Sequence, residues 1–210
     1  MKHLVLIGAA GSGKGTQAAR LVADKGYKHI STGDLLRNEI SKDSELGKKV
    51  KSVMDSGALV SDELVIELIH ANSNLDKNQY VFDGYPRNLV QAQTLDKEVL
   101  KGRPSLAVHF KIDMGKLVNR LTNRRTCKTC GAIYNLISQA PAKAGICDKC
   151  GGTNLVHRDD DKEEAIKKRL DIFQQNTQPV LEHYKAGGRL LEVNAEAPID
   201  TVFHQINGQL

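Results

Sequence analysis

The sequence predicts an α/β protein, a parallel sheet of five strands with flanking helices, and three observations support this. Short apolar runs alternate with helical patterns along most of the 210 residues, which is the rhythm of parallel βα units in a doubly wound sheet. A glycine-rich loop joins the first apolar run to the first helical pattern, as in phosphate-binding loops. Residues 32–72 and 125–157 lack this rhythm. We therefore expect both segments to be insertions at the ligand-binding edge of the sheet.

The expected elements follow from apolar periodicity and from residues that begin or end helices. The five strands are predicted at residues 3–7, 27–30, 80–82, 106–112 and 190–193. Helices are predicted at residues 14–23, 34–41, 45–56, 62–72, 88–100 and 114–124, then along a long segment with apolar Ile166, Leu170, Phe173, Val180 and Tyr184, and at the C-terminal face formed by Ile199, Val202, Phe203 and Ile206. Ser61 is a candidate N-cap, Pro179 should kink the long helix, and Gly187-Gly188 should end it.

Composition places the chain among ordinary globular proteins. Lys plus Arg is 30 and Asp plus Glu is 25, a net charge of +5, with 40% hydrophobic and 26% charged residues. This excludes collagen, long disorder and a disulfide-dense miniature protein. Trp is absent and aromatic residues are 4%, which is little material for stacking nucleic-acid bases. We expect anionic small-molecule ligands and no nucleic-acid partner.

Location and assembly are predicted from what the sequence lacks. No stretch approaches the roughly 20 apolar residues of a membrane helix, so no membrane contact is expected. The apolar run at residues 3–7 is too short for a secretory signal and is not followed by a small-residue cleavage site. We therefore expect a cytoplasmic protein. No sustained heptad pattern indicates a coiled coil, and we expect a monomer.

The glycine-rich loop is the first candidate site. Residues 8–16 read Gly-Ala-Ala-Gly-Ser-Gly-Lys-Gly-Thr between a predicted strand and a predicted helix, the context that a phosphate-binding loop requires. Backbone N–H groups and the helix N-terminus bind phosphate oxygens, and the lysine adds an ammonium. The candidate ATP-binding residues are Gly11, Ser12, Gly13, Lys14, Gly15 and Thr16. The alternative, a tight glycine turn without a ligand, explains neither the lysine nor the following helix.

Four cysteines form the second candidate site. Cys127-x2-Cys130 is followed after sixteen residues by Cys147-x2-Cys150, a spacing typical of a four-thiolate structural zinc site in a reducing compartment. An iron–sulfur cluster and unligated cysteines are the alternatives. Four protein ligands leave no open position, so this metal should be structural. His157 is expected to be exposed and not a ligand. The candidate packing residues around the cysteines are Ile133, Tyr134, Leu136, Ile137, Ile146, Leu155 and Val156.

Two further motifs carry a family resemblance. Together with the phosphate loop, Ser31-Thr32-Gly33-Asp34-Leu35-Leu36-Arg37 and Asp83-Gly84-Tyr85-Pro86-Arg87 resemble the signatures of the adenylate kinase family. The cysteine insert, Arg158-Asp159-Asp160-Asp161 and Arg169 resemble the zinc lid of its long form, so the resemblance covers essentially the whole chain. Ala10 replaces the usual Pro and Tyr85 the usual Phe. Neither departure removes a charge or a phosphate donor.

The resemblance implies a fold and an activity. The fold is the P-loop nucleoside-monophosphate kinase type, with a helical monophosphate-binding flap and a lid inserted into the core. In residues, the core is 1–31, 61–121 and 160–210, the flap is 32–60, and the zinc lid is 122–159. The implied reaction is reversible transfer of the ATP γ-phosphoryl group to AMP, which gives two ADP and requires Mg²⁺. ATP, AMP and ADP are thus the expected partners.

The resemblance also implies roles for individual residues, mostly arginines, whose planar charged fork grips phosphate. The catalytic set is Lys14, Arg87, Arg124, Arg158 and Arg169. ATP would also contact Arg120 through its adenine, and AMP would contact Thr32, Arg37, Gly84, Arg87, Gln91, Arg158 and Arg169. Asp83 would hold Mg²⁺ through water; its alternatives are a helix N-cap or an ion pair with arginine. The four cysteines would bind one structural zinc.

Three other functions remain open at this point. A different nucleoside-monophosphate kinase could share the scaffold, although Thr32 favours AMP within the family. A zinc ribbon joined to an NTPase could bind nucleic acid, but the insert has one aromatic residue, Tyr134, and adjoins acidic Asp159–Asp161. A nucleotide sensor without activity would have little need of so many converging arginines.

Overall fold

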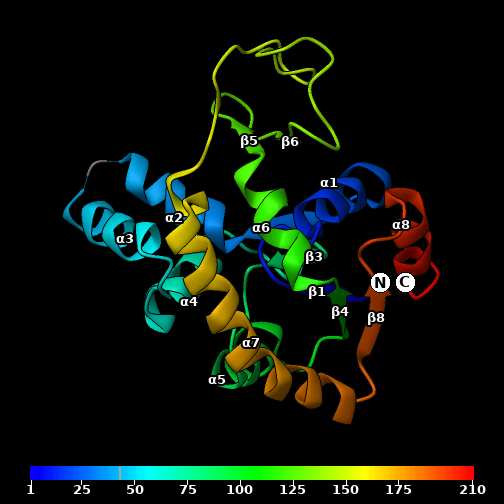
Figure 1. Ribbon diagram of the computed structural model, residues 1–210. Coiled ribbons are helices and arrows are strands. Elements are labelled where there is room, and N and C mark those ends of the chain that lie inside the picture. The colour runs from blue at the N-terminus through cyan, green and yellow to red at the C-terminus, as the bar shows by residue number, and fades with distance from the viewer. Residues whose placement is uncertain (43) are drawn as a thin grey trace.

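The core of the protein is a five-stranded parallel sheet, as the sequence predicts. The computed structural model describes residues 1–42 and 44–210. The strands lie in the order β2-β3-β1-β4-β8 (Figure 1). Their bounds are β2 Lys28–Ser31, β3 Tyr80–Asp83, β1 His3–Ile7, β4 Ser105–Lys111 and β8 Leu190–Asn194, and every pairing is parallel. The carboxyl ends of all five strands therefore meet at one edge.

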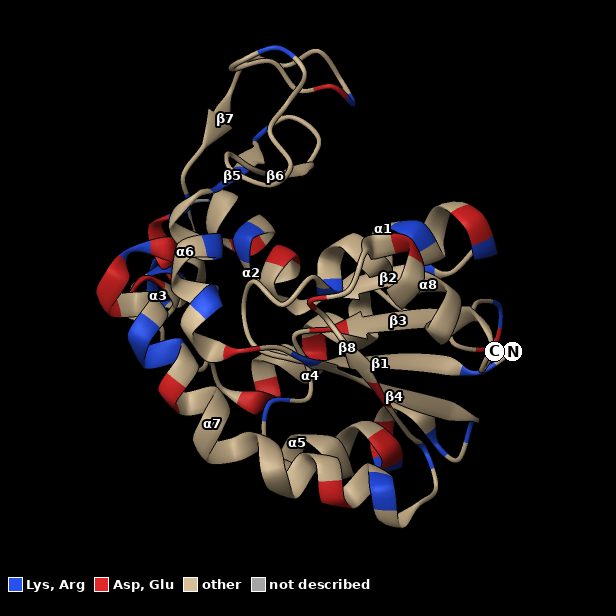
Figure 2. Ribbon diagram, turned by 45° about the vertical axis from the view of Figure 1, so that its right-hand side comes forward, with Lys and Arg blue, Asp and Glu red and all other residues tan. Residues whose placement is uncertain are grey.

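Helices cover both faces of this sheet (Figure 2). On one face lie α1 Lys14–Lys25 and α8 Ile199–Asn207, and on the other lie α4 Asp62–Ala71, α5 Leu89–Thr94 with the π-helical turn Leu95–Leu100, and α7 Glu163–Ala186. Strand β1 shows why both faces need cover. Leu4 and Leu6 pack against α1 and α8, whereas Val5 and Ile7 pack on the opposite side. A strand buried on both faces reads as a continuous apolar run.

The first insertion is helical, as expected. Helices α2 Thr32–Ser41 and α3 Glu45–Asp55 follow β2 and precede α4. Their starts are set locally, because Ser31 Oγ accepts a hydrogen bond from the Asp34 N–H and Ser44 Oγ accepts one from the Gly47 N–H.

The second insertion contains a small sheet that the sequence analysis did not predict. Strands β5 Arg124–Cys127, β6 Ile133–Asn135 and β7 Leu155–Val156 pair antiparallel in the order β6-β5-β7. This segment follows α6 Met114–Thr122 and rises away from the main sheet (Figure 1). We call the segment that holds these strands, residues 122–159, the lid.

Several predicted details were wrong. The helix expected at residues 114–124 ends at Thr122, because the Asn123 side chain donates to the Asn119 carbonyl oxygen and competes with the backbone. Arg124 thus opens strand β5. The segment 88–100 changes from α-helix to π-helix at Leu95. Ser61 precedes α4 as expected, but its side chain makes no capping hydrogen bond.

The long helix ends where it was predicted to end, and the candidate lid core is only partly buried. Helix α7 ends before Gly187, as predicted, and contains Pro179, whose kink stays a prediction. Of the apolar lid residues, Tyr134 is buried and Ile146, Leu155 and Val156 are half-buried, whereas Ile133, Leu136 and Ile137 are exposed, so the expected apolar packing was wrong for these three. In the described ranges 1–42 and 44–210, no helix combines the length and the apolar character needed to cross a membrane.

Candidate active site

One cleft of about 1010 Å³ gathers the predicted nucleotide-binding residues. It lies at the carboxyl ends of the strands, between the core, α2 and the lid. Its lining includes Gly11, Ser12, Gly13, Lys14, Gly15, Thr16, Thr32, Arg37, Asp83, Gly84, Arg87, Gln91, Arg120, Arg124, Arg158 and Arg169. The structure therefore brings together every residue that the sequence analysis assigned to ATP, AMP or magnesium. Their individual roles stay predictions.

The phosphate loop is shaped by two glycines and closed by the lysine. Gly11 and Gly13 have φ angles of 80° and 96°, in the left-handed region that favours glycine. Helix α1 begins at Lys14, so its free N–H groups face the loop. The Lys14 Nζ donates to the carbonyl oxygens of Gly8 and Ala9, at 2.8 and 2.9 Å. The loop thus folds around the Lys14 ammonium group.

The electrostatic environment of Lys14 is strongly positive. Burial is the main reason that the pKa of Lys14 falls from 10.5 to about 8; the Asp83 carboxylate opposes this fall, and the charges of Arg87, Arg169 and Arg124 add to it. A neutral or cationic ligand would gain little here. A phosphate group would relieve the repulsion and restore the ammonium form.

Three arginines of the lid edge and α7 are held by two buried carboxylates. The Arg124 Nε and Nη2 donate to Asp161 at 2.7 and 2.5 Å, and the Arg158 Nε and Nη2 donate to Asp160, both at 2.9 Å. Arg169 Nη1 donates to the Asp160 carbonyl oxygen at 2.7 Å and lies 3.3 Å from Asp161 Oδ1. Burial alone would raise the Asp160 pKa, but Arg158 and Arg169 hold it well below its ordinary value. Two parallel N–H···O bonds are also how arginine grips phosphate.

Asp83 ends strand β3 beside the phosphate loop. Its side chain is 15% exposed, and its Oδ2 lies 3.6 Å from His29 Nε2. Burial opposes ionisation, but His29 and Lys14 lower its pKa below the ordinary value. Neither alternative explanation for Asp83 holds: Asn88 caps α5, and the described residues place no arginine nitrogen within 4 Å of the Asp83 carboxylate. An ionised carboxylate that faces a phosphate loop suits Mg²⁺ and its bound waters.

The predicted monophosphate residues also line this cleft. Arg37 Nη2 donates to Asp34 at 2.5 Å, and Arg87 Nε donates to the Gly84 carbonyl oxygen at 2.7 Å. Gln91 is 2% exposed and bonds to the Arg87 N–H and to Asp62, whose involvement the sequence analysis missed. Asp62 lies 29 positions from Gln91, so no local pattern could have revealed it.

The expected adenine contact of ATP lies near the last strand. The Arg120 Nη1 is 3.5 Å from the Gly11 carbonyl oxygen. Residues 195–199, which lead from β8 into the first residue of α8, contribute Ala195, Ala197, Pro198 and Ile199 to the same cleft. The sequence analysis assigned none of these four to a nucleotide. The available signal was their place after the last strand, since ligands bind beyond strand carboxyl ends.

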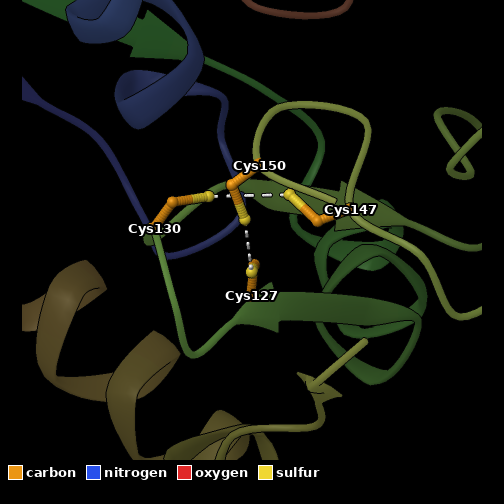
Figure 3. A group of neighbouring side chains, drawn as sticks. All are labelled: Cys127, Cys130, Cys147 and Cys150. Atoms are coloured by element: carbon orange, nitrogen blue, oxygen red, sulfur yellow. Dashed lines mark hydrogen bonds between the residues drawn. The ribbon is translucent and has the colours of Figure 1, made fainter. Parts of the chain in front are cut away.

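The four cysteines form a compact cluster at the base of the lid's loops (Figure 3). Their Sγ atoms all lie within 4.8 Å of one another, with 3.6 Å between Cys127 and Cys150 and 3.5 Å between Cys130 and Cys147. A tetrahedral zinc with Zn–S bonds of about 2.3 Å separates its sulfurs by about 3.8 Å. A disulfide needs about 2.05 Å, so the geometry fits zinc and not a cystine. His157 is exposed and outside this cluster, as predicted.

The Tyr134 side chain contacts the cysteine cluster directly. Its hydroxyl accepts from the Asp148 N–H at 2.7 Å and lies 3.3 Å from Cys147 Sγ. The contact between the Tyr134 hydroxyl and Cys147 Sγ, together with backbone N–H groups of the same turn, lowers the pKa of Cys147 to about 6. A thiolate is the form that binds metal. Tyr134, Cys127 and Cys147 also form the buried centre of the lid.

A phosphate loop that faces several arginines is typical of clefts that bind nucleotide phosphates. The fold that carries this cleft is that of the P-loop nucleoside-monophosphate kinases, a class of phosphotransferases. Comparison with known proteins narrows the class. The family model described as adenylate kinase matches residues 6–189. The chain belongs to the adenylate kinase family.

Curated relatives agree over nearly the full chain. The adenylate kinase of Caldicellulosiruptor bescii is 45% identical over 193 residues, which cover 90% of this chain and 89% of the relative. That of Thermodesulfovibrio yellowstonii is 44% identical, with 97% and 96% covered. That of the more distant Archaeoglobus fulgidus is 40% identical, with 99% and 97% covered.

The lowered pKa of Lys14 predicts how nucleotide binding depends on pH. The free protein loses the Lys14 proton near pH 8, whereas bound phosphate keeps the ammonium charged. Affinity for a non-hydrolysable ATP analogue should therefore be constant below pH 8 and fall above it, by up to about tenfold per pH unit. Isothermal titration calorimetry from pH 6.5 to 9.5 measures this.

The control for this prediction is Lys14→Met, which should bind weakly with no fall above pH 8. An unchanged affinity of the wild-type chain from pH 7 to 9.5 would contradict it. The same pKa has a consequence for stability. Because the folded chain binds fewer protons than the unfolded chain between about pH 8 and 10.5, this group makes folding more favourable as pH rises through that window.

Proposed function

We propose that the chain catalyses reversible transfer of the γ-phosphoryl group of Mg·ATP to AMP, which gives two ADP. The observation that carries the proposal is the convergence of Lys14 with Arg87, Arg124, Arg158 and Arg169 on one cleft. Phosphoryl transfer between two polyanions consists mostly of positioning and charge neutralisation. These five converging cations can supply both the positioning and the charge neutralisation.

Each side of the cleft takes one nucleotide in this proposal. The phosphate loop and Lys14 bind the β- and γ-phosphates of ATP, whose adenine packs between Arg120 and residues 195–199. Arg37 and Arg87 bind the AMP phosphate, and Thr32, Gly84 and Gln91 contact its base. The supporting observation is that both sets line the same cleft.

The remaining arginines act on the phosphoryl group during its transfer. Arg124, Arg158 and Arg169 neutralise charge on the transferring phosphoryl group, and the carboxylates of Asp160 and Asp161 hold their planes in place beforehand. Mg²⁺ bound with ATP neutralises phosphate charge, and Asp83 is the residue placed to hold its waters.

The lid completes the proposal. It binds one structural zinc through Cys127, Cys130, Cys147 and Cys150, and it closes over ATP as one body, which excludes water as a competing acceptor. The core, flap and lid are residues 1–31, 61–121 and 160–210, residues 32–60, and residues 122–159. We further propose a cytoplasmic monomer without nucleic-acid partners.

Product analysis tests the reaction directly. Purified protein is incubated with Mg·ATP and AMP, UMP, CMP or GMP, and the products are separated by chromatography. We expect two ADP from ATP plus AMP and little product with the other three. Formation of ADP without consumption of any monophosphate would indicate an NTPase, and no turnover with any acceptor would indicate a nucleotide sensor.

Replacement of Arg87 tests the cation cluster. Arg87→Ala should lower kcat/KM for AMP by at least about a hundredfold, because it removes a charge that faces the phosphates. Unfolding midpoints in urea should change little, because Arg87 contacts no carboxylate within 4 Å in the described part of the chain. Steady-state kinetics and urea denaturation measure the two quantities.

Arg103→Ala is the matched control, because Arg103 pairs with exposed Asp76 outside the cleft and should leave turnover intact. Arg124→Ala should also lower turnover by orders of magnitude, but it leaves fully buried Asp161 with Arg169 as its remaining arginine partner. Of these variants, only Arg124→Ala is therefore expected to lose some stability. Near-normal turnover in both variants would refute the assigned roles.

Metal removal tests the lid. After the thiols are modified with a mercurial, a metallochromic dye should detect about one zinc per chain. Calorimetry of the metal-free protein should show a transition at lower temperature, because the lid has almost no apolar core without its metal. Turnover should fall, while circular dichroism shows that the main sheet and its helices stay folded.

His157→Ala should retain its zinc and its calorimetric profile, which controls for damage to the lid surface. One unchanged calorimetric transition after verified metal removal would contradict the structural role of zinc.

A further inference from the structure

The side-chain amide of Gln91 is held by one hydrogen-bond donor and one hydrogen-bond acceptor. Its Oε1 accepts from the backbone N–H of Arg87 at 2.7 Å, and its Nε2 donates to Asp62 Oδ1 at 2.5 Å. Its own backbone N–H donates to Asn88 Oδ1 at 2.8 Å. Gln91 is 2% exposed, yet it lines the cleft. This buried amide therefore has little freedom to turn.

These partners determine which end of the amide is which. A glutamine amide could in principle be rotated by 180° to exchange its oxygen and nitrogen. Here the backbone N–H can only donate, and an ionised carboxylate can only accept. The nitrogen must therefore lie at Asp62 and the oxygen at Arg87. One N–H of Nε2 remains after these bonds are made, so the amide has a hydrogen-bond donor to offer a ligand.

The Asp62 carboxylate pairs with the Gln91 amide across two helices. It lies in the first turn of α4, which packs on the face of the sheet that also holds α5, whereas Gln91 lies on α5. Among the residues that the structure describes, no lysine, arginine or histidine nitrogen lies within 4 Å of its carboxylate. Its neighbour Glu63 is exposed and makes no contact with Gln91. The Asp62 carboxylate is thus dedicated to the amide.

We propose that Asp62 is a specificity-determining positioning residue: it locks the Gln91 amide so that an N–H donor faces the base of the acceptor monophosphate. A donor at this position favours a base whose facing ring nitrogen accepts a hydrogen bond, as N1 of adenine does. It disfavours hypoxanthine and guanine, whose N1 carries a hydrogen, because two donors then meet and neither is satisfied. Asp62 itself does not touch the substrate.

This inference rests on the proposed function and deepens it. The test measures kcat/KM for AMP and for IMP, with KM for ATP, in the wild-type chain and in variants. Asp62→Ala should lower the AMP-to-IMP ratio by about tenfold, the value of one hydrogen bond in a buried site, with KM for ATP unchanged. Asp62→Asn keeps an acceptor oxygen but can also turn to donate, so its ratio should fall less, by about threefold.

Two controls separate this role from a structural one. Glu63→Gln removes a charge from the same helical turn and should leave the ratio unchanged. In a Gln91→Ala background, Asp62→Ala should cause no further loss of discrimination, because the amide it positions is gone. If Asp62→Ala fails to fold, Asp62→Asn decides alone.

The outcomes are distinct. Absence of AMP phosphorylation by the wild-type chain overturns the proposed function and this inference together. AMP phosphorylation with an unchanged AMP-to-IMP ratio in the Asp62 variants overturns the inference alone. So does an equal effect of Asp62→Ala with and without Gln91, because Asp62 would then act by another route.

Discussion

Mutual repulsion among the cations gathered at one edge of the sheet is the constraint on which the rest of the structure depends. Two unit charges 4 Å apart interact by about 4 kcal/mol at an effective dielectric constant of 20, and here Lys14 is surrounded by arginines. Acidic side chains in two places partly balance this charge. Asp83 lies beside the phosphate loop, and Asp160 and Asp161 lie in the short 3-10 turn Asp159–Asp161 just before α7. These carboxylates offset part of the repulsion among the cations.

The buried carboxylates also fix geometry. Both Arg124 and Arg158 are held through Nε and Nη2 by two oxygens of one carboxylate, so their planes are set before a ligand arrives. Ordering a long side chain costs conformational entropy. Because folding has already ordered these arginines, less of that cost falls on substrate binding. The same logic applies to Gln91, whose two partners are part of the fold.

Sequence patterns alone predicted the layers and the phosphate loop, whereas the other cleft residues followed from the family resemblance. Apolar runs of strand length give the sheet, and the glycines with Lys14 give the phosphate loop. What escaped prediction depends on distant contacts. Arg124 follows a helical pattern but pairs in a lid strand, and Asp62 meets Gln91 only after α4 and α5 pack on the same face.

The small core of the lid and the positions of its arginines depend on the same pair of strands. Arg124 opens strand β5, and Arg158 follows strand β7 by two positions, so these arginines stand where the chain enters and leaves the lid. Their separation therefore depends on the pairing of β5 with β7. That pairing is short, and the buried interior above it is little more than Tyr134 and the cysteines. If the lid binds zinc as proposed, loss of the metal would leave few apolar contacts to keep the two strands together, and these arginines would be held only loosely. The proposed zinc, which would touch neither nucleotide, would in this way set the geometry of the cations proposed to bind them.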